Sequence, residues 1–175
     1  MGTTLSYIDD ADRAYGATGM AVGIAVANAE EMAEGIDLDL DPADMMMMSD
    51  SFWFSGCWGD GVADIRKQLV GAYHVAMVMA IGNLLCRTIV GYHKIATAAQ
   101  RKMLLQTVVA EALESCGLDD DEITPYFEKD YNYLVRVFSH SGVQGVVTRM
   151  ASRLQECRQM SRQEMLEYLR PLSML

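Results

Sequence analysis

The longest uncharged stretch of the chain constrains its fold more than any other feature. Nineteen consecutive residues without a charge, QLVGAYHVAMVMAIGNLLC, lie between Lys67 and Arg87. A stretch of this length could cross a bilayer as a helix, but His74 and Asn83 dilute it and the mean hydropathy of the chain is only +0.07. Because no second span is present, we expect no membrane span. We predict instead a central helix near residues 65–89 that is buried on all sides.

The segment before this stretch has the period of a long helix. From Ile8 to Met32, small or apolar residues recur every three or four positions, which predicts one helix of about 26 residues. This face includes Gly16, Gly19 and Gly23, and each glycine costs about 1 kcal/mol of helix propensity relative to alanine. Close packing against another helix would offset that cost. The neighbouring helix belongs either to the same chain or to a second copy.

Four further helices are predicted after the central one. The third helix should run from about Tyr92 to Ser115, with Gly117 as its C-cap. Thr124 as N-cap and Pro125 in the first turn predict the start of a fourth helix. Capping boxes indicate where the fifth helix and a short final helix begin, at Ser141 with Gln144 and at Ser161 with Glu164.

Length and composition agree with a single helical domain. The chain has 175 residues, of which 51% are hydrophobic and 22% charged, as in globular proteins that bury one core. We find no β-hairpin signal and no reliable alternating strand. The sequence therefore predicts an all-α fold, a single-domain helical bundle of five to seven helices over residues 1–175. Its least regular part should be the acidic, methionine-rich and aromatic region 35–61.

The first half of region 35–61 resembles a calcium-binding loop but fails the test for one. If Asp37 were the first position of the loop, Pro42 would replace the required glycine and Met48 the final bidentate carboxylate. We expect Gly35 to cap the first helix, followed by an acidic loop and a short helix after Pro42. The four methionines 45–48 could form an adaptable docking surface, but filling of core gaps is the favoured interpretation.

The second half of this region, SFWFSGCWGDG, carries both tryptophans and two of the four phenylalanines between three glycines. Its rings either close one end of the bundle or form a recognition loop for an apolar ligand or partner. Since the loop directly precedes the central helix, it could cover that helix's first turns and enclose a small-molecule pocket. The residues of this hypothetical ligand-binding pocket are Trp53, Phe54, Trp58, Tyr73 and His74.

His74 is the best single candidate for a site residue in the sequence. An imidazole inside an apolar helix must either satisfy its nitrogens within the core or line a cavity. A satisfied core histidine is the favoured interpretation. His93 and His140 lie near expected helix starts, where surface or capping roles are usual.

The charge of the chain is strongly negative and unevenly placed. Fourteen basic and 24 acidic residues give a net charge of −10, which argues against a nucleic-acid partner because phosphate contacts dominate such binding. Residues 1–50 contain 1 basic and 11 acidic residues, whereas residues 126–175 contain 7 and 5. This asymmetry fits either a solvated acidic face or opposite ends of two copies meeting. Arg149 and Arg153, one turn apart, could hold an anion or an acidic patch, but a solvated face is favoured.

The cysteines and the N-terminal residues suggest a reducing compartment. Cys57, Cys86, Cys116 and Cys157 are widely spaced, and no cysteine or histidine cluster has metal-ligand spacing. No secretory leader pattern is present, so we expect a cytoplasmic protein that holds no metal. The sequence leaves any cofactor open.

The sequence contains no motif that identifies a reaction. It has no phosphate-binding glycine loop, dinucleotide fingerprint, zinc-protease motif or nucleophile elbow. We therefore predict a non-catalytic protein that acts through association, either as a homodimer or with another protein. The alternative is a small-molecule-binding protein or an enzyme that uses the pocket beside Tyr73 and His74.

Overall fold

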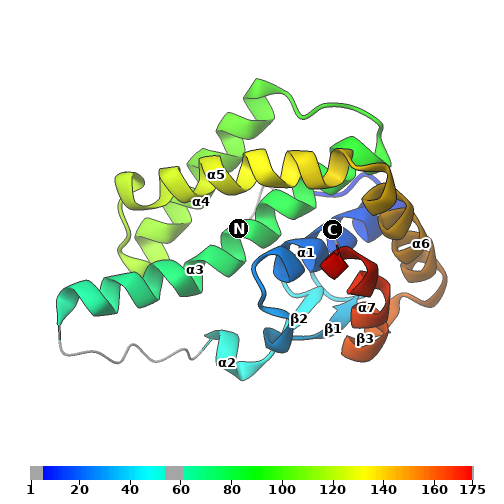
Figure 1. Ribbon diagram of the computed structural model, residues 1–175, viewed down its shortest axis with the longest axis horizontal. Helices are drawn as coiled ribbons and strands as arrows, with labels where there is room; N and C mark the ends of the chain where they lie inside the picture. The colour runs from blue at the N-terminus through cyan, green and yellow to red at the C-terminus, as the bar shows by residue number, and fades with distance from the viewer. Residues whose placement is uncertain (1–5, 54–60, 175) are drawn as a thin grey trace.

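Helix α3 (Val62–Leu85) runs diagonally across the molecule, with the other elements arranged around it (Figure 1). The computed structural model describes residues 6–53 and 61–174. At its end α3 continues into a π-helical segment, Cys86–Gly91. Met77, Ile81 and Leu85 are at most 1% exposed, whereas Val62 is 74% exposed. The predicted central helix is confirmed, but burial on all sides was wrong, because its first half is largely exposed and its second half contains the only partly buried Met79, Ala80 and Leu84.

Helix α3 with its π-helical extension is long and apolar enough to cross a membrane when judged by length and composition alone. Half of the residues in its most apolar 18-residue stretch are buried inside the fold. The core helix of a soluble protein meets the same criterion, so this property does not decide where the chain resides.

Helix α1 (Asp10–Val26) packs against α3 through the glycine face that the sequence indicated. A β-carbon on Gly19 would collide with the carbonyl oxygen of Gly82, and one on Gly23 would lie 2.6 Å from the carbonyl oxygen of Val78. The close neighbour is therefore a helix of the same chain. The expected length of about 26 residues was wrong, because the helix ends after 17 and Asn28 adopts a left-handed conformation with φ of 52°.

A small antiparallel sheet replaces the irregular region that the sequence predicted after Gly35. Strand β1 (Ala33–Asp37) lies between β2 (Met46–Met48) and β3 (Gln159–Ser161). Ile36 pairs with Met46 on one side and with Met160 on the other. The absence of strands and the capping role of Gly35 were thus wrong predictions. Such short strands, one of them from the far end of the chain, leave little local signal.

The methionine run serves the core rather than a free surface. Met45 is 0% and Met46 3% exposed, which confirms the core interpretation. The short helix expected after Pro42 is not formed, because this segment is a turn that leads directly into β2. A four-residue helix, α2 (Asp50–Trp53), follows instead.

The second half of the chain folds largely as predicted, with shifted helix starts. Helix α4 (Ala98–Cys116) begins after Thr97, which forms a capping box with Gln100, and ends at Gly117 with φ of 63°. The C-cap is confirmed, but the start at Tyr92 was wrong because the π-helical segment is followed by an irregular stretch. Leu104 and Val108 form the buried face of α4, whereas Leu113 is 54% exposed.

Helices α5 (Asp120–Ser139), α6 (Ser141–Cys157) and α7 (Arg162–Leu169) complete the bundle. Helix α5 begins one turn before the predicted N-cap, because Asp119 and Glu122 form a capping box and Pro125 is accommodated inside the helix. For α6, His140 rather than Ser141 is the N-cap residue. Val143, Val147 and Leu154 lie on the buried face of α6, and the capping box that starts α7 is confirmed. The fold is thus the predicted all-α helical bundle, with seven α-helices among the described residues.

Candidate functional site

The hypothetical pocket near the central helix is only partly described. Phe54 and Trp58 lie outside the described residues. Trp53 ends α2, which packs against β2 and the 3₁₀ turn Glu30–Met32. Tyr73 and His74 are placed on α3, but they contact two different helices. The pocket of the aromatic loop therefore stays a prediction, and Tyr73 and His74 do not point toward a common partner.

The two α3 side chains each form a hydrogen bond within the fold. The hydroxyl of Tyr73 donates to the carbonyl oxygen of Val108 in α4 at 2.7 Å, and burial raises the pKa of Tyr73. His74 Nε2 lies 2.7 Å from a carboxylate oxygen of Asp130 in α5. His74 therefore has a hydrogen-bond partner within the fold, as the favoured interpretation expected. Its side chain is 30% exposed, so it lies at a helix interface rather than deep in the core.

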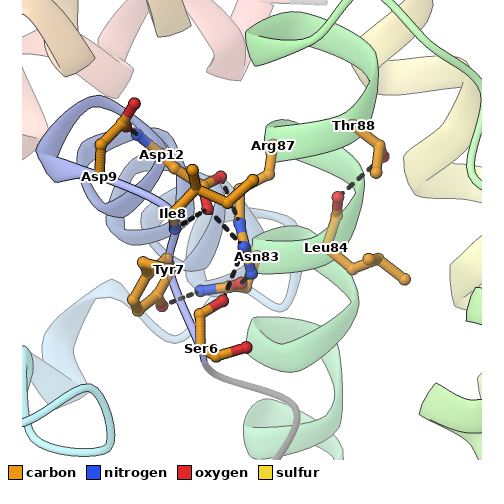
Figure 2. Close-up of polar contacts among 9 residues, drawn as sticks. All are labelled: Ser6, Tyr7, Ile8, Asp9, Asp12, Asn83, Leu84, Arg87 and Thr88. Atoms are coloured by element: carbon orange, nitrogen blue, oxygen red, sulfur yellow. Dashed lines mark hydrogen bonds and ion pairs between the residues drawn. The ribbon is translucent and has the colours of Figure 1, made fainter.

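A buried polar cluster lies where α1 meets the end of α3 (Figure 2). Arg87 Nε and Nη2 donate to the two carboxylate oxygens of Asp12 at 2.7 and 2.5 Å. Arg87 Nη2 also donates to the carbonyl oxygen of Ser6, and the guanidinium lies 4.5 Å from the ring centroid of Tyr7. Asn83 Nδ2 donates to the hydroxyl of Tyr7 at 2.6 Å. This clasp, made by Tyr7, Asp12, Asn83 and Arg87, ties the N-terminal segment to α3.

The groups of the clasp satisfy one another. Burial alone would raise the pKa of Asp12, but hydrogen bonds from Arg87 and from the Ile8 amide hold it below its ordinary value of 3.8. The bidentate geometry matches the fork of the guanidinium to the carboxylate and leaves little capacity for a ligand. We interpret the clasp as a structural element. One sign of the clasp was present in the sequence: Arg87 directly follows the uncharged stretch 68–86, and a guanidinium at the end of a buried helix requires a carboxylate partner.

A large groove lies on another part of the surface, formed by α1, α5, α6, α7 and the C-terminal 3₁₀ turn Arg170–Met174. Figure 1 shows α1, α6 and α7 gathered at one end of the molecule. The groove has a volume of about 1040 Å³. Its walls are mainly apolar, with Val22, Val26, Val137, Val143, Leu166 and Leu169 among them.

The charges around this groove are mostly basic in an otherwise acidic protein. Arg136, Arg162 and Arg170 line it together with His140, against Glu30 and Glu167. The Arg136 guanidinium lies 5.7 Å from the ring centroid of Tyr133. Within the described part of the chain, neither Arg136 nor Arg162 forms an ion pair with a carboxylate. An apolar groove with such arginines on its rim suits an amphipathic anion.

Only a coarse signal of this groove was present in the sequence. The basic excess of residues 126–175 was visible, but its arginines come from three separate elements and share no spacing. The pair singled out from the sequence, Arg149 and Arg153, lies outside the groove, and Arg153 forms an ion pair with Glu156 at 3.7 Å. Its favoured interpretation as a solvated face agrees with the exposure of both side chains.

No metal-binding group of three or more acidic, histidine or cysteine side chains occurs among residues 6–53 and 61–174. Cys86, Cys116 and Cys157 are free thiols, and Cys57 lies outside the described residues. Comparison of the chain with protein-family models, with curated proteins and with solved structures gives no match in any of the three.

Proposed function

We propose that the protein acts through non-catalytic association, by binding an acidic amphipathic helix of a partner protein in the groove. The observation that carries this proposal is the combination of apolar walls with Arg136 and Arg162, which have no carboxylate partner in the described part of this acidic chain. A partner helix would place its apolar stripe on the walls and its carboxylates at the rim.

The physical chemistry of arginine favours this kind of partner. A guanidinium binds a carboxylate through two parallel hydrogen bonds and is less strongly hydrated than an ammonium group. Arginine and tyrosine are also enriched at interfaces, and Tyr133 lies beside Arg136 on the groove. The helix face rich in small residues no longer supports association, because it contacts α3 of the same chain. The proposal of association therefore rests on the groove and not on the small-residue face of α1.

The test uses a labelled helical peptide of about 20 residues, with a leucine stripe flanked by glutamates. Fluorescence anisotropy should show binding to the wild-type protein, and Arg162→Glu should weaken it about tenfold or more. The matched control is Arg149→Glu, which makes the same charge change on the exposed side of α6 and should leave the affinity unchanged. Equal binding of a peptide with lysines in place of the glutamates would contradict the proposal.

A second candidate function is the binding of a small amphipathic carboxylate in the same groove. The volume of about 1040 Å³ is near the upper end of the range for small-molecule sites. This candidate keeps the apolar ligand expected from the sequence but moves it away from Tyr73 and His74. Displacement of a polarity-sensitive naphthalene sulfonate dye by dodecanoate, lost in Arg162→Glu but not in Arg149→Glu, would favour it over the helical peptide.

A further inference from the structure

We propose that two copies associate through antiparallel α5 helices related by a two-fold axis, so that the acidic first turn of one α5 meets Arg136 at the groove of the other copy. This inference rests on the proposed function, because it assigns a source for the carboxylates that meet the arginines of the groove. It is carried by the pattern of exposed side chains along α5.

The outer face of α5 exposes two large aromatic side chains. Tyr126 is 46% and Tyr133 45% exposed, and they lie seven residues apart, on the same side of the helix. Figure 1 shows α5 extending across the molecule from its α4 end to its α6 end. Exposed tyrosines on an accessible helix are typical of interfaces, because they bury a large area at a low cost in conformational entropy.

The charges of α5 have opposite signs at its two ends. The first turn contains Asp120, Asp121 and Glu122, whereas Arg136 is in the last turn and His140 follows. Asp121 and Arg136 are both exposed and lie about 22 Å apart along the helix. In an antiparallel pair, Asp121 of each copy lies next to Arg136 of the other. Antiparallel packing also aligns the two helix dipoles favourably.

One two-fold axis passes close to the middle of both the charged pair and the aromatic pair, although Asp121 and the tyrosines lie on opposite edges of the exposed side of α5. The midpoint between Asp121 and Arg136 is one residue from the midpoint between Tyr126 and Tyr133, which is about 1.5 Å along the helix. A face of this kind is complementary to itself, as a two-fold interface requires. Since Tyr133, Arg136 and His140 line the groove, the first turn of the second copy's α5 then lies over the groove.

The same axis brings the two copies of Lys129 together. Lys129 is exposed and lies at the centre of the α5 face, so like charges meet at the axis and weaken the pair. Lys129→Ala should therefore tighten self-association about threefold to tenfold. An unchanged or weaker affinity would argue against this register. Because alanine favours a helix, the variant is expected to keep its fold.

The decisive experiment is a charge swap followed by sedimentation velocity on the full chain. Asp121→Arg and Arg136→Asp, each alone, place like charges opposite one another and should weaken the dimer at least tenfold. An equimolar mixture of the two variants restores both charge pairs in a mixed dimer and should recover wild-type affinity. Recovery by mixing also excludes misfolding as the cause, and circular dichroism of each variant provides a further check.

The outcomes separate this inference from the proposed function. A wild-type protein that stays monomeric at about 100 µM, or a mixture that does not recover, overturns the inference. If the acidic peptide still binds and Arg162→Glu still weakens it, the proposed function stands with a different partner. If the chain dimerises with full recovery by mixing while the acidic peptide does not bind, the α5 pairing stands and the groove proposal fails.

Discussion

Arg87 and Arg136 have the same side chain in opposite surroundings. Arg87 is enclosed in the clasp, with both carboxylate oxygens of Asp12 as acceptors and a side chain that is 12% exposed. Arg136 stands at the rim of the groove, beside Tyr133 and without a carboxylate partner in the described part of the chain. The comparison shows how a charge whose partner lies within the fold stabilises it, whereas one that lacks such a partner is available for a ligand.

The largest expected effect is the loss of the enclosed arginine. Arg87→Met leaves the carboxylate of Asp12 buried without its charged partner, which should lower the free energy of unfolding by about 3–5 kcal/mol. Urea denaturation measures this change. The matched control is Arg136→Met, which should cost less than about 1 kcal/mol. Similar losses for both variants would remove the distinction between the two regions.

Close packing beside the clasp provides the next largest effect. Gly19→Ala adds a methyl group that collides with the carbonyl oxygen of Gly82, so it should destabilise the protein by about 1–3 kcal/mol. Gly71→Ala is the control on α3, since a β-carbon there meets nothing within 4 Å. It should stabilise by up to about 1 kcal/mol through helix propensity. Thermal melts that rank the two variants in the opposite order would contradict the α1–α3 contact.

Features that depend on neighbouring residues could be predicted from the sequence. The capping box at Ser161 depends on two residues three positions apart, so local spacing was enough to find it. The glycine face of α1 predicted a close helix contact, but spacing alone could not say which helix supplies it.

The features missed by the sequence depend on long-range contacts. Strand β3 pairs with β1 across more than half of the chain, and the groove collects side chains from Val22 to Leu172. The spacing of hydrophobic residues along the sequence does not indicate which distant segments will contact one another. Thr124 was a locally plausible N-cap, but Asp119 with Glu122 caps the helix one turn earlier and keeps Pro125 inside it.

Acid should reduce the contribution of the clasp. Because the pKa of Asp12 is lower in the folded state than its ordinary value of 3.8, its stabilisation is present above that value and is lost as pH falls through the folded pKa. In Arg87→Met, burial acts without the guanidinium and raises the pKa of Asp12. The difference in unfolding free energy between the wild type and Arg87→Met should therefore be largest at about pH 7, narrow as pH falls through that raised pKa, and be smallest below about pH 4. A difference that stays constant down to about pH 2 would show that the Asp12 carboxylate is not responsible.

The smallest expected effect on stability concerns the rim of the groove. Arg162→Ala should change the free energy of unfolding by no more than about 0.5 kcal/mol, because its guanidinium is exposed and forms no ion pair among the described residues. The same variant should weaken binding of the acidic peptide. Loss of stability comparable to that of Arg87→Met would assign Arg162 to the fold rather than to binding.

The contrast between the clasp and the groove is tested most directly by chemical-shift mapping of backbone amides during titration with the acidic helical peptide. The largest shifts should occur at Val26, Val137 and Leu166, which line the groove, with none at Asn83 and Arg87 in the clasp. Shifts centred on Asn83 and Arg87, with the groove residues unchanged, would contradict the account.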